Sequence, residues 1–305
     1  MATFNYVEKD GNLLEKKITA GLFTGNLGTP QVDLVNGGKS FTLRSISTSG
    51  LKPHTRGKGF NEGTVEDSKT VYTMGQDRDV EFYIDKQDVD ETNQELAMAN
   101  ISKSFIDEKV VPEVDSYRFS RMANYLDDEN LAVDGDLKKK LRVEEDLTKA
   151  NVYSQLKAGV AKVRKYNPAN LIGYVSSAVM DALEMSTEFN RSITNQNVGT
   201  TALDSRITSL DGVTLVEVWD DSRFKSKYDF TGEMKIADDA QDINFEIVAK
   251  QAVIPIVKEN AVYLFAPGEH TQGDGYLYQN RLYHDFFIKK SIVDGIFTSL
   301  ATKKV

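Results

Sequence analysis

The sequence predicts an α+β fold with two regions, and three observations lead to this expectation. Residues 38–85 have the pattern of a long two-stranded hairpin, in which apolar and polar residues alternate. An amphipathic stretch over residues 92–126 is longer than most globular helices. From residue 147 onwards, short helical segments and short strands follow each other, as they do in α/β units. The first two features predict an elongated region, and the third predicts a separate α/β region.

The hairpin is expected to have an outgoing strand around residues 41–46 and a returning strand over residues 71–84. In the returning strand, Val80, Phe82 and Ile84 alternate with polar neighbours, which is the period of a strand with one buried face. A polar, glycine-rich tip joins the two strands. Because an isolated hairpin is at best marginally stable in water, we expect it to lie on the body of its own chain or on a neighbouring copy.

Charge is distributed unevenly along the hairpin and the segment that follows it. Between Lys39 and Lys69 there are six basic and three acidic residues, whereas between Gln76 and Glu95 there are eight acidic and two basic residues. A basic tip and an acidic base favour association between copies of the chain. The whole chain has a formal net charge of -9, which argues against non-specific binding of nucleic acid by the entire surface.

The long helix has a start signal and an internal break. Thr92 and Glu95 fit a capping box at its first turn. The positive end of a helix dipole favours carboxylates, and three lie just before this start: Asp88, Asp90 and Glu91. An apolar stripe then continues along the stretch. Proline has no amide hydrogen and crowds the preceding turn, so we expect Pro112 to kink the helix or to split it into two collinear pieces.

Residues 126–145 are charged and have little periodicity, so we expect a connection there. The second region is expected to begin with a helix over residues 148–164, followed by a buried strand over residues 171–175 and a helix that ends near Met185. Further strands are predicted, in order, at residues 213–219, 243–256, 262–265 and 278–297, the last of them long and bent.

Composition narrows the class of protein. The chain of 305 residues is 40% hydrophobic and 27% charged, which is ordinary for a globular protein. No apolar run approaches the roughly 20 residues of a transmembrane helix, and the N-terminus lacks the basic start and apolar stretch of a secretory signal. Without cysteine, the chain has no disulfide, thiolate nucleophile or cysteine-based zinc site, which suits a reducing cytoplasm.

Several short sequence motifs along the chain resemble those of a known family. In the first half they are Ser49-Gly50-Leu51, Asp77-Arg78, Ile84-Asp85, Asp90-Glu91-Thr92 and Val111-Pro112-Glu113. In the second half they are Ser209-Leu210-Asp211-Gly212-Val213, Val216-Glu217-Val218, Ala252-Val253-Ile254 and Arg281-Leu282-Tyr283-His284-Asp285. The order and spacing of these motifs resemble those in the major capsid proteins of tailed bacteriophages, which have the HK97-type fold. The resemblance covers about Gly37 to Gly295.

The resemblance implies an HK97-like capsid fold in five parts. They are an N-terminal arm (1–37), an extended β-hairpin called the E-loop (38–85), a peripheral domain with a long spine helix (86–146), an α/β axial domain (147–262) and return strands of the peripheral domain (263–305). The implied function is that of a major capsid protein, which self-assembles as pentamers and hexamers into an icosahedral shell around double-stranded phage DNA.

The charge pattern and the resemblance together predict a contact between the E-loop tip and an adjacent subunit. The candidates on the tip are Lys52, Arg56 and Lys58, and those on the acidic surface are Asp85, Asp88, Asp90 and Glu91. The alternative is a solvated tip together with carboxylates that serve only the helix start. A single exposed ion pair contributes about 0 to 1 kcal/mol, so such a contact also requires main-chain and apolar groups.

Further partners and the location follow from the same resemblance. We expect a separate scaffolding protein, a portal, decoration proteins as an optional component, and packaged DNA that is contacted non-specifically. Only about 37 residues precede the hairpin, so we expect no removal of an N-terminal segment. The expected location is the capsid shell of the virion, assembled in the cytoplasm of the bacterial host without a membrane.

The sequence offers little support for catalysis. Its three histidines, His54, His270 and His284, lie far apart, and no HExxH, GxSxG or P-loop pattern is present. The acidic cluster lacks the glycine turn and terminal glutamate of a calcium loop. We therefore assign no catalytic, cofactor-binding or metal-binding residue. The main alternative is the shell protein of an encapsulin-like nanocompartment, which would bind a cargo peptide and exclude packaged DNA; a soluble enzyme is the less favoured third hypothesis.

Overall fold

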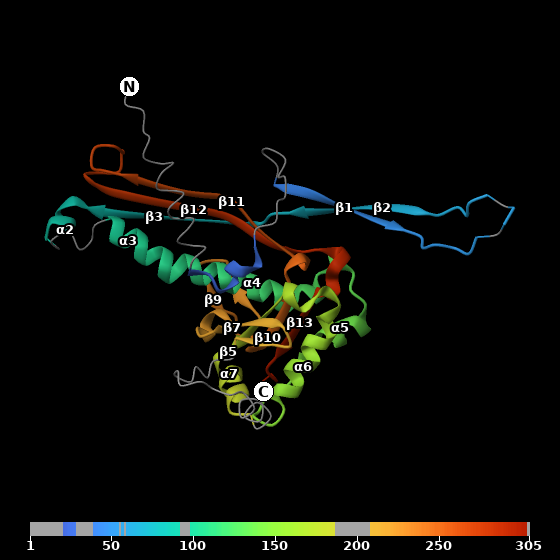
Figure 1. The fold of residues 1–305 in the computed structure, drawn as a ribbon. Helices are drawn as coiled ribbons and strands as arrows, with labels where there is room; N and C mark the ends of the chain where they lie inside the picture. Colours follow the sequence, from blue (N-terminus) through green and yellow to red (C-terminus); the bar gives the residue numbers. More distant parts are fainter. Residues whose placement is uncertain are drawn as a thin grey trace, which may run out of the picture.

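The computed structural model describes residues 21–28, 39–54, 56–57, 59–91, 98–186 and 208–303. These residues form two parts that meet along one long helix (Figure 1). On one side of the helix an extended three-stranded sheet continues into a projecting hairpin, and on the other side a six-stranded sheet and its helices form a rounded body. Among the described residues, none of the helices combines the length and the apolar character that crossing a bilayer requires. The predicted α+β class is confirmed.

The projecting hairpin consists of β1 (Ser40–Thr48) and β2 (Val65–Thr73), which pair antiparallel with Phe41 opposite Tyr72. At its root these two rings stack with centroids 5.2 Å apart, and both contact the ring of Phe287 edge-on. Beyond the root, most residues of both strands are exposed. The hairpin predicted from the sequence is therefore confirmed, and it is attached to the body through a small aromatic cluster.

The three-stranded sheet contains β3 (Gln76–Asp85), β11 (Val253–Phe265) and β12 (Gly275–Ile288), all antiparallel, in the order β11-β12-β3. Side chains of β3 alternate between half-buried and exposed, as the period of two predicted. The prediction of a single returning strand over residues 71–84 was wrong, because the chain leaves the hairpin at Met74 and enters the second sheet. Met74 is buried, and the Gly75 N–H donates to the Asp285 carboxylate at 2.8 Å. The break between β2 and β3 is therefore stabilised by a residue that is distant in sequence, Asp285.

The spine helix is built in pieces. Helix α2 (Lys86–Glu91) follows β3 directly, while the expected capping box at residues 92–95 lies outside the described residues. Helix α3 (Met98–Phe105) continues through a π-helical turn (Ile106–Val110) into α4 (Val111–Asn124). The Val111 N–H donates to the Ile106 carbonyl, five residues back. This wide turn directly precedes Pro112, which sits in the first turn of α4, where a missing N–H is tolerated. The predicted break is confirmed as a change of helical pitch.

The connection predicted at residues 126–145 was wrong. This segment contains short 3-10 turns (Tyr125–Asp127 and Glu129–Leu131), helix α5 (Gly135–Leu141) and strand β4 (Arg142–Glu144). The Asp134 side chain caps α5 by accepting from the Asp136 N–H. Strand β4 pairs in parallel with β13 (Ile296–Leu300). Three residues are too few to show a periodicity, so this strand exists only through its distant partner.

The six-stranded sheet has the order β4-β13-β10-β5-β7-β6. Its remaining strands are β5 (Leu171–Ser176), β6 (Ser209–Leu210), β7 (Val213–Val218) and β10 (Ile243–Ala249), and its helices are α6 (Val152–Val163) and α7 (Ser177–Glu184). The predictions for α6, β5, α7 and β7 are confirmed within a few residues. A separate two-stranded ribbon pairs β8 (Tyr228–Asp229) with β9 (Lys235–Ile236).

The last predicted strand was wrong in one respect. Residues 278–297 do not form one bent strand, because β12 ends at Ile288 and a short helical segment (Lys290–Gly295) precedes β13. Strand β13 then pairs with β10 of the six-stranded sheet. The C-terminal strands therefore link the two sheets covalently.

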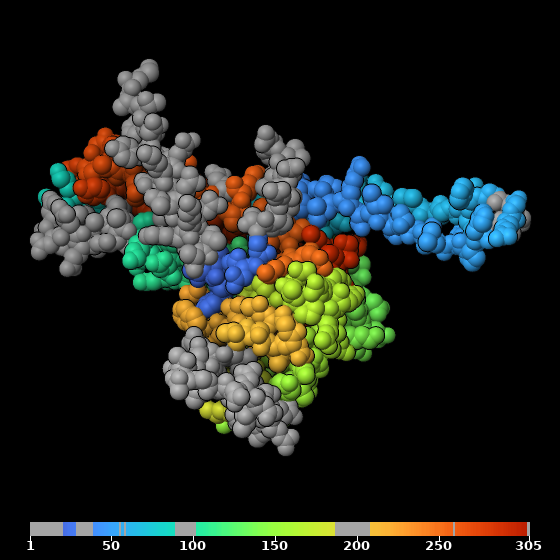
Figure 2. Space-filling model, in the orientation of Figure 1, coloured from blue at the N-terminus to red at the C-terminus, as the bar shows by residue number. Residues whose placement is uncertain are grey.

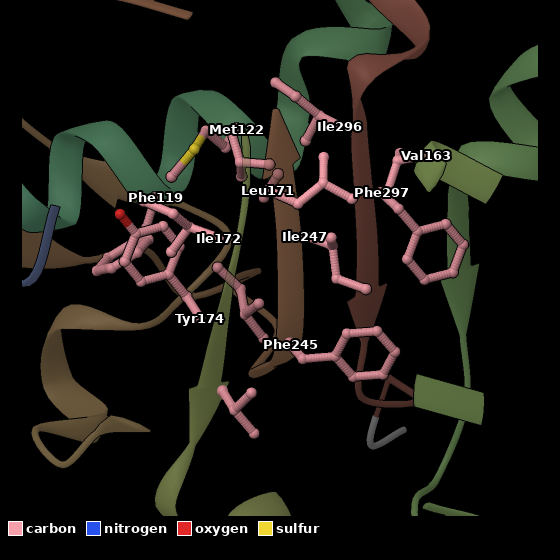
Figure 3. Close-up of a cluster of buried hydrophobic side chains, with 14 of the residues drawn as sticks. Phe119, Met122, Val163, Leu171, Ile172, Tyr174, Phe245, Ile247, Ile296 and Phe297 are labelled. Carbon is pink, nitrogen blue, oxygen red and sulfur yellow. The ribbon is translucent and has the colours of Figure 1, made fainter. Parts of the chain in front are cut away.

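The main core lies where α4 and α6 pack on the six-stranded sheet (Figure 3). Phe119 of α4 packs edge-on against Tyr174 of β5, with ring centroids 5.2 Å apart. On the α6 side, the rings of Phe245 and Phe297 stack 5.8 Å apart. The six-stranded sheet and its helices therefore have a hydrophobic core of their own. Burial of each large apolar side chain in it contributes roughly 1.5–3 kcal/mol. The hairpin has no comparable core.

Candidate intersubunit surfaces

The hairpin exposes apolar side chains that a monomeric protein would bury. Leu51 and Phe60 at its tip are 105% and 98% exposed, and Ile46, Val65 and Val71 on its strands are 69%, 70% and 63% exposed. Figure 2 shows the hairpin projecting away from the rest of the molecule. Several large apolar side chains exposed on one projecting element favour a site of protein contact. Charge counting missed Leu51 and Phe60; their apolar character in a polar tip was the available signal.

The basic candidates at the tip differ in their surroundings. The Lys52 ammonium donates to the Glu62 carbonyl at 3.0 Å, across the tip, so it helps to hold the tip together. The Asn61 side-chain amide donates to the Pro53 carbonyl at 2.9 Å in the same region. Arg56 lies in an exposed turn, and Lys58 falls outside the described residues. Lys52 therefore has an internal structural role as well as its proposed external one.

The acidic candidates lie at the far end of β3 and in α2. Asp85 ends β3, and its carboxylate accepts from the Gln87 N–H at 2.9 Å, so it stabilises the start of α2. Asp88 lies in the first turn of α2. Asp90 and Glu91 are the last two residues of α2, and their side chains are outside the described part of the chain. The helix-start interpretation therefore fits Asp85 and Asp88.

The hairpin tip and the acidic end of β3 with α2 do not meet within one chain. From the junction at Met74, β3 runs in one direction towards α2 and the hairpin runs in the other (Figure 1). A contact between Arg56 at the tip and Asp85 or Asp88 would consequently need a second copy.

Strand β3 carries a row of carboxylates, of which only Asp85 was among the acidic candidates predicted from the sequence. Asp77, Asp79, Glu81 and Asp85 share the exposed face of the strand, with Tyr83 between the last two, whereas Phe82 on the other face contacts Phe105 of α3; we call the four carboxylates the acidic strip. Arg281 of β12 donates to both carboxylate oxygens of Asp77, at 2.9 and 2.7 Å. These hydrogen bonds lower the pKa of Asp77, while partial burial opposes the shift. The alternation of acidic and apolar residues along residues 77–85 was the signal in the sequence.

A buried polar network holds the N-terminal described segment on the spine helix. The Asp115 carboxylate of α4 accepts from the N–H groups of Phe23 and Thr24, at 3.0 and 3.1 Å, and from the Thr24 hydroxyl at 2.7 Å. Arg223 lies 3.6 Å from the same carboxylate, and its guanidinium carbon lies 5.5 and 5.8 Å from the ring centroids of Phe23 and Trp219. These contacts hold Phe23 and Thr24 against α4.

The histidines are not gathered in one place. His54 lies near Phe60 at the hairpin tip, and His270 lies in the loop between β11 and β12, where its Nε2 is 2.8 Å from the Gly275 carbonyl oxygen. His284 is 1% exposed on β12, as expected of a structural histidine on a strand. Burial, with Arg118 and Arg78 nearby, lowers the pKa of His284 to about 3. Within the described ranges, no group of three or more histidine or acidic side chains is placed to hold a metal ion.

Comparison with known proteins places the fold. No protein-family model matches the sequence, and no curated protein matches it. The asymmetric unit of the bacteriophage PhiM1 mature capsid matches with a TM-score of 0.64 and 15% identity, over 88% of this chain and 83% of that one. The capsid structure of the cyanophage P-SCSP1u matches with a TM-score of 0.65 and 12% identity, over 91% and 87%.

A further match is the virus-like particle from Pyrococcus furiosus, with a TM-score of 0.52 and 10% identity, over 97% of this chain and 99% of that one. At such identities the likeness concerns the fold, and it extends over hairpin, spine and body together. The chain therefore has the HK97-type fold of the phage capsid proteins.

Proposed function

We propose that this chain is the major capsid protein of a tailed bacteriophage, and that it self-assembles as pentamers and hexamers into an icosahedral shell around double-stranded DNA. One observation carries the proposal. The hairpin projects from the body with its large apolar side chains exposed, in a fold shared with phage capsid structures. A hairpin without a core of its own requires a surface to lie on, and copies of the same chain supply one in a closed shell.

Apolar groups at the tip provide most of the contact energy in this proposal. Covering a fully exposed leucine or phenylalanine contributes roughly 1.5–3 kcal/mol, and Leu51 and Phe60 are both fully exposed. An exposed ion pair contributes about 0 to 1 kcal/mol. Pairs between Arg56 or Lys58 and Asp85, Asp88, Asp90 or Glu91 of an adjacent subunit would then select the orientation. Charge reversal at Lys52 and Arg56 tests the tip: unchanged assembly at low salt would rule out this role.

The remaining partners are proposals of the same kind. A separate scaffolding protein, a portal and, optionally, decoration proteins complete the particle, which would assemble in the host cytoplasm. The net charge of -9 supports weak, non-specific contact with packaged DNA, because an acidic chain attracts the genome little. We retain the five-part division at residues 37, 85, 146 and 262; strand β13, from the last part, pairs with β10 of the fourth.

A second candidate is the shell of an encapsulin-like nanocompartment. The match to the Pyrococcus furiosus virus-like particle favours it, since almost the whole of both chains is covered, but its TM-score of 0.52 is lower than the 0.64 and 0.65 of the phage capsids. The two functions differ in content. Particles isolated from the native source would contain double-stranded DNA in the first case and a cargo protein in the second.

Electron microscopy of the chain expressed alone in bacteria, with light scattering to measure size, tests assembly directly. Closed shells, or regular pentamers and hexamers, are the expected result. A stable monomer or dimer at high concentration, unchanged by addition of lysate from infected cells, would contradict the proposal and return attention to an enzyme.

A further inference from the structure

The loop between β11 and β12, residues 266–274, is held by a side chain of its own. It lies at the end of the three-stranded sheet that is opposite the hairpin (Figure 1). His270 accepts a hydrogen bond at Nδ1 from the Gln272 N–H, at 3.2 Å. Its Nε2 lies 2.8 Å from the carbonyl oxygen of Gly275, the first residue of β12. We call these two hydrogen bonds the His270 bridge, because they join the middle of the loop to the strand.

The two partners fix the protonation state that the bridge requires. A carbonyl oxygen only accepts a hydrogen bond, so Nε2 of His270 must carry a hydrogen. A backbone N–H only donates, so Nδ1 must be without one. The bridge therefore exists only with a neutral ring in its Nε2–H tautomer. A second proton would occupy the lone pair that accepts from Gln272, and two donors would then face each other.

Two glycines allow the loop to lie close to β3. Gly273 has a φ of +90°, and a Cβ there would lie 2.7 Å from the Tyr83 hydroxyl. A Cβ on Gly275 would clash with the Ile84 carbonyl oxygen. The rings of His270 and Tyr83 meet edge-on, with centroids 6.1 Å apart. The loop conformation that the bridge stabilises therefore covers part of the Tyr83 side chain.

The surroundings of the ring allow it to become charged. His270 is half-buried, so water reaches it. The ring of Phe265, the last residue of β11, lies 6.5 Å away and is uncharged. The titratable groups on the other elements around the ring are three carboxylates and a phenol: Glu269 and Asp274 of the loop, and Asp85 and Tyr83 of β3. The carboxylates attract a positive charge, whereas the Gln272 N–H repels it.

We propose that His270 is a pH-sensitive lock on the β11–β12 loop, closed by the His270 bridge when the ring is neutral and released when the ring is protonated. Histidine is the side chain that ordinarily gains its charge between about pH 5 and 8. Because the closed loop binds one proton fewer than the released loop, release is favoured as the pH falls. Released residues 271–274 no longer cover Tyr83, so the surface at this end of the sheet changes with pH. The lock belongs to the single subunit and goes beyond the proposed function.

Nuclear magnetic resonance of full-length, unassembled subunits tests the bridge. Nitrogen chemical shifts of the ring distinguish the two neutral tautomers, and we expect Nε2–H for His270 at about pH 7.5. Hydrogen exchange of the Gln272 amide, corrected for its intrinsic rate, reports the closed loop. Its protection should fall about fivefold on acidification to about pH 5.5, which is the effect of losing one ordinary hydrogen bond. A hydrogen on Nδ1 at neutral pH would overturn the proposal.

The variant H270N separates a pH-sensitive lock from a merely structural bond. The asparagine oxygen accepts from the N–H two residues on, as Nδ1 does here, but it does not titrate. H270N should therefore keep most of the protection of the Gln272 amide and lose its dependence on pH. H270A has no acceptor and should show low protection at every pH. The matched control is H54N: His54 lies at the hairpin tip, so the loop should respond to pH as in the wild type.

The outcomes are decisive for the lock alone. If H270N and wild type show the same pH dependence, another group releases the loop and the proposal is wrong. It is equally wrong if the Gln272 amide keeps its protection while His270 takes up a proton. Circular dichroism establishes that each variant is folded. Since every measurement is made on single subunits, a chain that forms no shell would refute the proposed function and leave the lock standing.

Discussion

Replacing Glu246 by glutamine should make the protein more stable at neutral pH, and the gain should grow with pH. Glu246 of β10 lies opposite Tyr174 of β5 and Thr298 of β13, and it is 0% exposed. Neither of its carboxyl oxygens has a hydrogen-bond partner in the described structure. Burial raises the pKa of Glu246 well above its usual value; Thr298 is adjacent and opposes the shift, but its own hydroxyl makes no bond within the geometric limits. In the folded state this carboxyl therefore stays protonated to a higher pH than in the unfolded chain.

The sign and the size of this pH-dependent stability difference follow from proton linkage. In the unfolded chain a glutamate has a pKa of roughly 4.3, so above this pH the folded state binds one proton more than the unfolded state. Stability then falls by about 1.4 kcal/mol per pH unit until the buried carboxyl itself ionises. Glutamine takes no part in this equilibrium. The free energy of unfolding of E246Q, relative to wild type, should therefore rise from pH 5 upwards, by at most about 1.4 kcal/mol per pH unit, for as long as the buried carboxyl of the wild type stays protonated.

Urea unfolding of unassembled subunits, followed by circular dichroism at several pH values, measures this difference. Glu144 is exposed in β4, so E144Q serves as the control and should show no trend with pH. A constant difference between E246Q and wild type from pH 5 to pH 7 would refute the argument. A growing loss of stability in E246Q would show instead that a partner stabilises the ionised carboxylate.

Three more substitutions test other parts of the structure. D115N should lower the free energy of unfolding by about 3–5 kcal/mol, because it removes the buried carboxylate that faces Arg223; urea unfolding measures this, and no loss would contradict the role of the network. Relative to H284Q, wild type should lose stability as the pH falls from roughly 6.5 towards 3, by about 1.4 kcal/mol per unit, because unfolded His284 binds a proton that the folded state, with a pKa of about 3, does not; acid titrations in which the two proteins keep a constant difference would contradict this. G159A should cost about 1–3 kcal/mol, since a Cβ there would lie 2.9 Å from the Phe245 ring; a thermal midpoint equal to wild type would show that α6 shifts freely.

Much of the local structure was predictable because its signal is local. A strand with one buried face shows a period of two, and Val80, Phe82 and Ile84 showed it. A helix packed on one side repeats every three to four residues, so α6 was expected where it is found. Pro112 marked the change of helical pitch, because its missing N–H acts on its own turn.

The candidate surfaces were predictable in part. Counting charges identified a basic hairpin followed by an acidic segment, and the structure places these at opposite ends of the elongated part. Counting charges did not show that Asp77, Asp79, Glu81 and Asp85 share one face of β3, although their alternation with other residues was a local signal. That Arg44 lies opposite Lys69 could not be inferred, because it depends on the register between two strands. The apolar character of Leu51 and Phe60 within a polar tip was visible in the sequence, but their full exposure was not, since exposure depends on what the rest of the chain covers.

The sequence by itself determined the α+β class, the hairpin, the long helix and its break, and the separation of charge, because each depends on neighbours within a few residues. Only the tertiary structure decided where strands pair. The hairpin ends at Met74 because Gly75 bonds to Asp285, more than two hundred residues away, and β4 is a strand because β13 lies beside it. It also decided that Glu246 is buried without a partner. Pairing and burial depend on residues that are distant along the chain, and no local pattern contains that information.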